Sequence, residues 1–225
     1  MKSQFLIWIA LFTSIIACKN DVNNTGSPSL SKEVPENVLT SKTFIIKYKT
    51  EVKYKDASNI ATSTQWIDTE NDRVAIETES ENNLMRKKLK SKDLTIIKGK
   101  EAWIIDLNSK TGYYGGESKL LNASQAEIVQ AKDDATFRKK VEESGGQILG
   151  SENFLGKKCI VVELSDSSGK SEMKTKIWYY QGIPLKMINA FYNMVATEIQ
   201  ENVKILDSTF EVPEGIKMKD MPGKK

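Results

Sequence analysis

The sequence predicts a mainly β protein, a curved antiparallel meander of about ten strands that forms a half-open β-barrel with a helical insertion on its concave side. Two observations predict it. Residues 44–54 alternate between apolar and charged side chains, which is typical of a strand with one buried and one solvated face. Further segments of strand composition follow, separated by turn-forming residues such as 56–59 and 98–100.

The first residues have the pattern of a secretory signal. Lys2 is followed by an apolar run over residues 5–16, which is shorter than the roughly 20 residues that span a bilayer. The run ends in Ala17-Cys18 and resembles the lipobox of bacterial lipoproteins. The resemblance implies a signal peptide over residues 1–17 and acylation of Cys18, with chains such as palmitate; an ordinary signal peptide with a chance cysteine is the alternative.

The predicted domain organisation follows from composition. Residues 18–41 are largely polar and predict a flexible tether behind the lipidated cysteine. Residues 42–220 form one half-barrel domain, and residues 221–225 a frayed tail. Lys19, in place of an aspartate after the cysteine, implies by the same resemblance an outer-membrane location, with the periplasmic or surface side left open.

Each predicted element is justified by its periodicity and its bounding turns. The early strands are expected at residues 44–54, 61–68, 73–79, 84–90, 94–97 and 101–107. A capping box at Ser124–Glu127 begins the helical stretch, and Ser144–Gly146 ends it. The later strands are expected at 147–154, 157–164, 172–180, 185–192 and 195–205, with a last one at 207–215 that runs into a Pro-Gly turn.

The residue inventory excludes several classes of function. The chain has no histidine, so neither a Ser-His-Asp triad nor an imidazole zinc site can form. It has 33 basic and 30 acidic residues, a balance that gives no field selecting nucleic acid. No phosphate-binding glycine loop is present. We therefore expect a protein that is not an enzyme and that needs no cofactor or metal, although a pair of catalytic carboxylates leaves no sequence signature.

Two local features have both a structural and a functional interpretation. Cys159 lies in an apolar run and is expected to be a buried free thiol, with an intermolecular disulfide as the alternative. The basic cluster at residues 86–90 is expected to be a solvated strand face, with contact to anionic lipid head groups as the alternative.

Two late motifs carry a family resemblance. Trp178–Lys186, a strand ending in aromatic residues followed by Gly-Ile-Pro, and the closing Phe-x-x-Pro-x-Gly at Phe210–Gly215 resemble the Lol-type (LolA-like) lipoprotein carrier superfamily. The resemblance implies a half-barrel around an apolar cavity that holds lipids or other hydrophobic ligands. The chain departs from the pattern because it shows no long N-terminal helix, and Arg73 is only a weak match for the arginine that holds the carriers closed.

The expected function is a membrane-anchored, non-enzymatic lipoprotein that binds or carries a lipid or other apolar ligand in the envelope. Aromatic side chains suit acyl chains, and the expected cavity-lining residues are Phe44, Tyr48, Tyr54, Trp66 and Trp103. The same residues could instead fill a packed core. The alternative function is an interaction or sensing module for another envelope protein, with an aromatic patch at Trp178–Tyr180.

Overall fold

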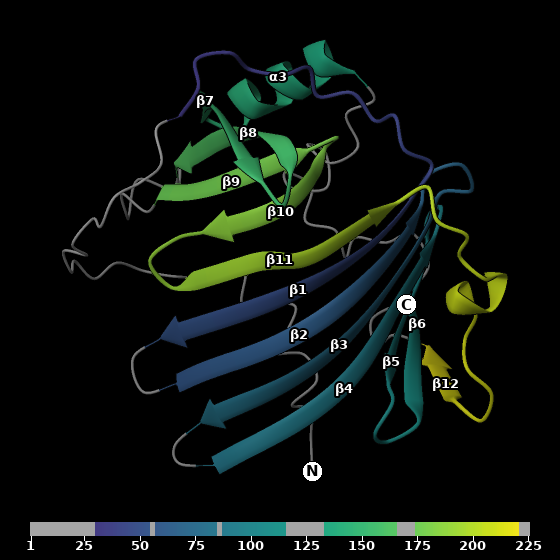
Figure 1. Ribbon diagram of the computed structural model, residues 1–225. Helices are drawn as coiled ribbons and strands as arrows, with labels where there is room; N and C mark the ends of the chain where they lie inside the picture. The colour runs from purple at the N-terminus through teal and green to yellow at the C-terminus, as the bar shows by residue number, and fades with distance from the viewer. Residues whose placement is uncertain (1–29, 55–56, 85–86, 116–132, 166–173, 221–225) are drawn as a thin grey trace.

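The computed structural model describes residues 30–54, 57–84, 87–115, 133–165 and 174–220. Within them, twelve strands form one curved sheet (Figure 1). The strands are β1 (Thr43–Tyr54), β2 (Ala57–Asp68), β3 (Arg73–Leu84), β4 (Lys87–Lys98), β5 (Glu101–Asp106), β6 (Thr111–Gly115), β7 (Gly146–Phe154), β8 (Lys157–Ser165), β9 (Lys174–Tyr180), β10 (Ile183–Ile188), β11 (Tyr192–Glu201) and β12 (Lys217–Asp220).

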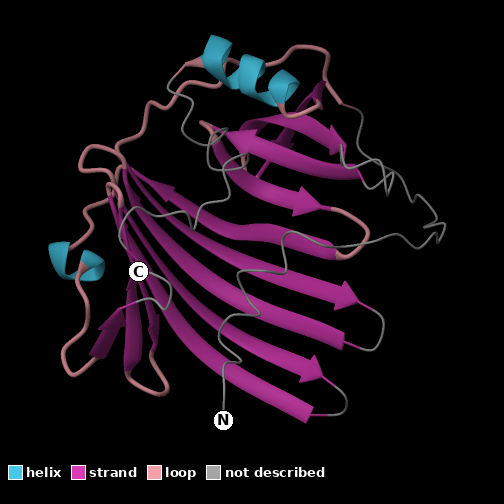
Figure 2. Cartoon of the chain, turned by 180° about the vertical axis from the view of Figure 1, so that it is seen from behind, coloured by secondary structure: helices cyan, strands magenta, loops and turns pink. Residues whose placement is uncertain are grey.

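The order of the strands confirms the predicted open meander. It runs β12-β6-β5-β4-β3-β2-β1-β11-β10-β9-β8-β7, so that the first strand lies in the middle beside the eleventh. Neighbouring strands are antiparallel except β12, which pairs with β6 in parallel. Figure 2 shows the long strands β1–β4 sweeping across the molecule, with β7 and β12 at the two free edges. The twelve described strands exceed the expected count of about ten: β6 and β12 lie where no strand was predicted, while the segments predicted at 84–90 and 94–97 form the single strand β4.

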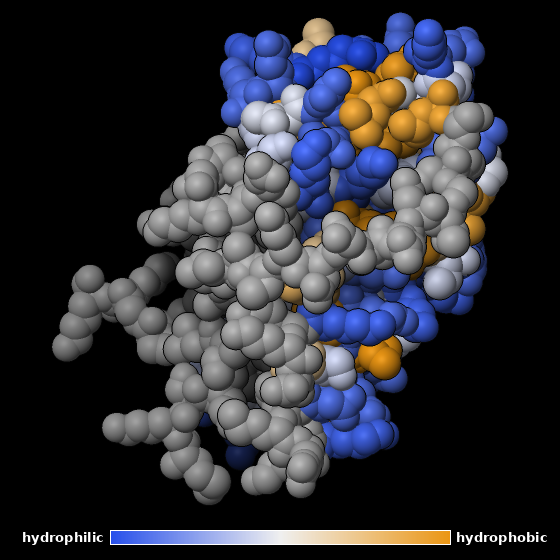
Figure 3. Space-filling model, turned by 90° about the vertical axis from the view of Figure 1, so that its left-hand side faces the viewer, coloured by the Kyte–Doolittle hydropathy of each residue, from blue (hydrophilic) through white to orange (hydrophobic). Residues whose placement is uncertain are grey.

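The two faces of the sheet differ in chemistry because side chains alternate along each strand. We call the face that carries Phe44, Ile46 and Tyr48, all buried, the inner face. The opposite, outer face carries ion pairs such as Lys47–Glu198. Seen from the left of Figure 1, apolar and hydrophilic side chains share the surface, and the largest apolar patch lies near the top (Figure 3).

One helix, α3 (Asp134–Glu143), covers the end of the sheet at β7–β9 (Figure 1). The Asp133 carboxylate accepts a 2.8 Å hydrogen bond from the Thr136 amide and caps the helix. Gly145, with φ of 70°, follows its end, as the glycine signal predicts. The predicted helical insertion is confirmed here, while the capping box at Ser124–Glu127 lies outside the described residues.

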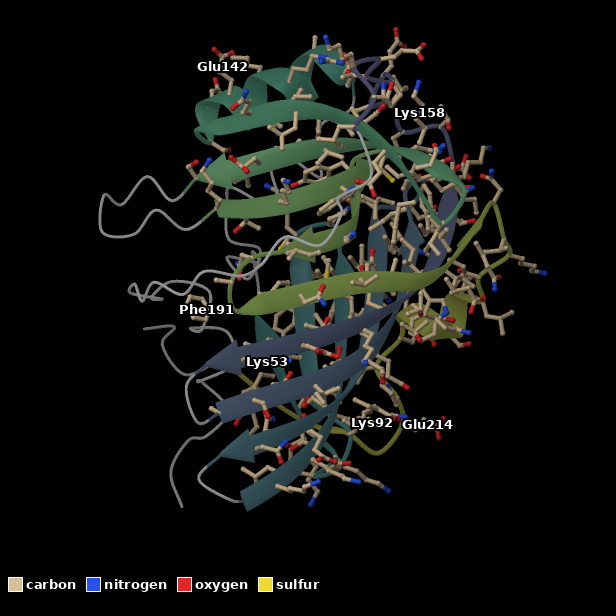
Figure 4. The ribbon with its side chains drawn as sticks, turned by 60° about the vertical axis from the view of Figure 1, so that its left-hand side comes forward. Lys53, Lys92, Glu142, Lys158, Phe191 and Glu214 are labelled. Atoms are coloured by element: carbon tan, nitrogen blue, oxygen red, sulfur yellow. The ribbon has the colours of Figure 1, made fainter. Side chains whose placement is uncertain are left out.

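The C-terminal segment folds over the outer face instead of forming the predicted strand. A 3-10 helix, η1 (Asp207–Phe210), buries Phe210 completely. Val212 and Ile216 then pack against Leu94, Ile96 and Ile105. Figure 4 shows Lys92 and Glu214 on the same side of the sheet. The expectation of a strand at 207–215 is wrong because the sheet offers an apolar outer patch that the segment covers by its side chains.

Residues 30–42 precede β1 and lie against the domain. We call them the strap. The Ser31 and Ser151 backbones form an antiparallel bridge, and Leu30 packs into the core. The sequence assigns residues 18–41 to a flexible tether; residues 30–41 are instead docked, because β7 and the β9–β10 turn supply partners for their backbone amides.

Candidate functional site

The candidate site is the inner face of the sheet. At its β7–β10 end the face is closed by α3, whose Phe137 and Val141 pack on Ile160, Val162, Ile177, Tyr179 and Met187. The rings of Phe137 and Tyr179 meet edge to face at 5.3 Å between centroids. Among the described residues, no other helix lies over the inner face.

Two of the predicted cavity-lining residues lie on this face. Phe44 and Tyr48 are buried beside β11, where Tyr48 pairs with Ala196. The Tyr48 hydroxyl donates a 3.0 Å hydrogen bond to the Pro184 carbonyl, and burial raises the pKa of the phenol. Tyr54 ends β1 with the same alternation, but its side chain lies outside the described residues. Phe44 and Tyr48 therefore contribute to a packed core, and ligand contact by them stays a prediction.

The other two predicted residues face the opposite way. Trp66 pairs with Ile45, the neighbour of Phe44, and Trp103 pairs with Ile96 on the same outer rows. Trp103 lies 5.5 Å from the Tyr114 ring, between centroids, and packs beside the C-terminal segment. The expectation that all five aromatic residues share one face is therefore wrong. The two-residue period separates the two faces within each strand. Which of them continues a given face of the neighbouring strand depends on the pairing register.

The inner face also carries polar residues that the sequence analysis did not single out. The Asn59 side-chain amide donates a 2.7 Å hydrogen bond to Asn82, and the Ser80 and Ser91 hydroxyls lie 2.9 Å apart. Asn59, Asn82 and Ser80 are buried. The signal that could have found them is the alternation of glutamates with Thr78, Ser80 and Asn82 along β3, which separates one charged face from one small and polar face.

Asp93 and Asp106 are half-buried carboxyls that pair across β4 and β5 on the inner face. The hydrogen bonds of Asp93 are few. Its Oδ2 accepts a 2.8 Å hydrogen bond from the Ser91 hydroxyl. Burial raises the pKa of Asp93; the Ser91 hydrogen bond opposes this rise, and the negative charge of Asp106 adds to it. Asp106 itself is engaged at the β5–β6 turn, where it accepts hydrogen bonds from the amides of Asn108 and Ser109.

Arg73, the candidate raised by the family resemblance, does not reach the inner face. It pairs with Asp68 at 2.5 Å and with Asp207 at 2.8 Å, and its guanidinium lies 4.5 Å from the centre of the Phe210 ring. Arg73 therefore fastens the C-terminal segment to the outer face.

A polar cluster fixes the strap to the sheet. Glu201 accepts hydrogen bonds from Ser41 at 2.9 Å and Tyr180 at 3.0 Å and forms an ion pair with Lys157. Burial opposes ionisation of Glu201, but the hydrogen bonds from Lys157, Ser41 and Tyr180 outweigh it and hold its pKa below the ordinary value. The cluster lies at the end of the strap, and another part of the strap contacts α3.

Asn37 links the strap to two further elements. Its amide donates a 2.9 Å hydrogen bond to Asp134 of α3, and its side-chain oxygen accepts one of 2.6 Å from Gly182. Its buried Nδ2 has no hydrogen-bond partner among the described residues. The strap thus connects α3 to the β9–β10 turn.

Cys159 and the described residues of the basic cluster fit their structural interpretations, a buried thiol and a solvated strand face. Cys159 is fully buried with a free thiol, and burial raises its pKa to about 12. Lys88 and Lys90 both pair with Glu81, at 3.0 and 3.9 Å. Cys18 and Arg86 lie outside the described residues.

Across the described ranges, no group of histidine, cysteine or acidic side chains is arranged to hold a metal ion. No helix in the same ranges combines the length and apolarity needed to cross a membrane.

Comparison with known proteins gives remote similarity of fold. No family model matches the chain, and no curated protein matches it. Among solved structures, an uncharacterised conserved protein from Thermus thermophilus is similar, with TM-score 0.46 and 9% identity over 80% of this chain and 91% of that one. A putative outer membrane lipoprotein-sorting protein domain from Vibrio parahaemolyticus gives TM-score 0.32 and 12% identity over 77% and 91%.

A β-barrel-like protein of a domain family of unknown function from Brucella abortus gives TM-score 0.36 and 5% identity over 73% of this chain and 99% of that one. At these scores the similarities support no functional conclusion, and the function has to be argued from the sheet itself.

Proposed function

We propose that the chain is a non-enzymatic envelope lipoprotein that holds a hydrophobic or amphipathic ligand on the inner face of β1–β5. The proposal rests on one observation: the two parts of the inner face are buried to different degrees. The inner face of β8–β10 is closed by α3, while Ile67, Val74, Ile76 and Ile97 on the inner face of β2–β4 are only half-buried. Half-buried aliphatic side chains on a curved sheet are the lining that an apolar ligand needs.

The alternative, a module that binds another envelope protein, loses the patch on which it depended. Trp178 and Tyr179 are buried, and the Trp178 indole donates a 2.9 Å hydrogen bond to Glu152. Tyr180 points its hydroxyl at Glu201. Of the three aromatic residues, only Tyr180 is partly exposed, which is too little to form the expected patch.

The test of ligand binding is native mass spectrometry of the mature chain, carrying Cys18→Ser and purified without detergent, followed by organic extraction. A co-purifying lipid or apolar metabolite supports the proposal. Ile76→Lys places a charge on the inner face of β3 and should remove the bound species. The matched control is Ile60→Lys on the outer face of β2, where Ile60 is 47% exposed, and should leave it bound. A protein without ligand that also takes up no apolar dye would contradict the proposal and favour a filled inner face.

Membrane attachment through Cys18 is a separate part of the proposal. Two or three acyl chains hold a protein stably at a bilayer, whereas one gives only marginal binding. Metabolic labelling with an alkyne palmitate should mark the full chain in a bacterial host, and Cys18→Ser should lose both the label and the membrane fraction. Labelling that survives Cys18→Ser would overturn this assignment. Sucrose-gradient separation of the two membranes tests the outer-membrane location.

A further inference from the structure

The inner face is ordered along the strands, because the register aligns its side chains in rows across β1–β5. The row nearest the start of β1 is entirely apolar. It consists of Phe44, Ile67, Val74, Ile97 and Ala102. The next row mixes apolar and polar side chains, with Ile46, Gln65, Ile76, Thr95 and Ile104.

Further along the strands the rows gain polar side chains, although Ala61 in the fourth row and Val52 and Leu89 in the fifth are apolar. The third row consists of Tyr48, Ser63, Thr78, Asp93 and Asp106. In the two rows after it, Ser80 faces Ser91 and Asn59 faces Asn82. At about 3.3 Å per residue, the four residues from Phe44 to Tyr48 separate the apolar first row from the polar third row, which holds Asp93, by about 13 Å. Such a gradient matches a ligand with an apolar chain at one end and a polar head at the other.

The described charged side chains on this part of the inner face have one sign. Among the described side chains of β1–β5 that point inward, the charged ones are Asp93 and Asp106, and none is Lys or Arg. On the outer face the same strands alternate acids and bases, as in Lys92 between Glu77 and Glu79 at 3.0 and 2.9 Å. Asp106 is held by its turn, whereas Asp93 has a single side-chain donor, Ser91, in the described structure. An anionic head beside Asp93 would be repelled, and a cationic one would satisfy its free oxygen.

We infer that the ligand is an amphiphile with an amine head, whose chain lies over the apolar row and whose ammonium group meets Asp93. The inference rests on the proposed function, since it names the class of ligand held on the same face. The half-buried position of Asp93 makes a charge-assisted hydrogen bond stronger than it would be at the surface.

The test compares three ligands with the same twelve-carbon chain: dodecylamine, dodecanoate and dodecyl maltoside. Each displaces a neutral apolar dye, N-phenyl-1-naphthylamine, from the mature chain carrying Cys18→Ser, at pH 7 and below micelle concentrations. We expect dodecylamine to bind at least about tenfold more tightly than dodecanoate, a factor within the range for one desolvated charge pair. Asp93→Asn should reduce this preference to about twofold or less, with the binding of dodecyl maltoside retained.

The matched control is Glu79→Gln, which removes the same charge from the outer face, where Glu79 pairs with Lys92. It should leave the head-group preference unchanged, and urea unfolding should show that both variants are folded. Equal affinity for amine and carboxylate, tightest binding of the maltoside, or an unchanged preference in Asp93→Asn would each overturn the inference while leaving the proposed function standing. Failure of the dye and all three ligands to bind would overturn both.

Discussion

The Ser41 hydroxyl donates a 2.9 Å hydrogen bond to the Glu201 carboxylate and so joins the strap to the last residue of β11. The two residues are 160 positions apart in the chain. Gln181 completes the junction, since its Oε1 accepts hydrogen bonds from the amides of Thr40 and Ser41 and its Nε2 donates to Glu201. One carboxylate thus joins the end of the strap to β11, and its contribution to docking can be tested by mutation.

Glu201→Ala should destabilise the fold by about 2–4 kcal/mol, because it leaves Lys157 and Ser41 without their common acceptor in a partly buried site. The measurement is the free energy of unfolding in urea. The matched control is Glu198→Ala on the same strand, which removes an exposed pair with Lys47 and should change stability by less than about 0.5 kcal/mol. Equal effects of the two substitutions would show that Glu201 does not hold the strap.

The same carboxylate should make stability depend on pH. The pKa of Glu201 is held below its ordinary 4.5 in the folded chain, so its contribution is complete above that pH and is lost as the pH falls through the lowered value. Glu201→Gln has no such titration. The difference in urea midpoint between the native chain and Glu201→Gln should therefore be largest at pH 7 and shrink as the pH falls below 4.5. A difference that is constant with pH would count against an ionised Glu201.

Phe210→Ala should destabilise the chain by about 3–5 kcal/mol, since Phe210 is fully buried on the outer face and its ring lies under Arg73. It should also speed amide exchange in β12, which follows in the same segment. Leu206→Ala is the control, because Leu206 is 64% exposed and lies one residue before η1. Unchanged exchange in β12 would show that the edge strand is held independently of Phe210.

Cys159 should be unreactive in the folded chain. Its thiol is fully buried and its pKa is about 12, so both access and the thiolate fraction are low at pH 8. In a chain carrying Cys18→Ser, a chromogenic disulfide reagent should label no thiol within an hour under native conditions, and one thiol per chain in denaturing urea. Rapid labelling of the native chain would contradict a buried thiol, and a dimer on a non-reducing gel would favour an intermolecular disulfide through Cys159.

Much of the sheet could be predicted from the sequence because period-two alternation and turn residues are local signals. Strands β7 and β8 begin and end within one residue of their predicted bounds, and the end of α3 follows the glycine signal. Along β3, charged residues alternate with small polar ones, which is also a local signal. It indicates a small, polar face of this strand without knowledge of the strand pairing.

The sequence by itself determined that the chain is a meander of one-sided strands with a buried free thiol and no histidine chemistry. The tertiary structure decided which side chains meet. It turned Trp66 and Trp103 away from Phe44, because face assignment depends on the register between strands rather than on the period within one. It also docked the strap and replaced the last predicted strand by η1 and β12. The partners of those segments, Glu201 for one and the apolar patch at Ile96 for the other, lie far away in the chain and leave no local signal.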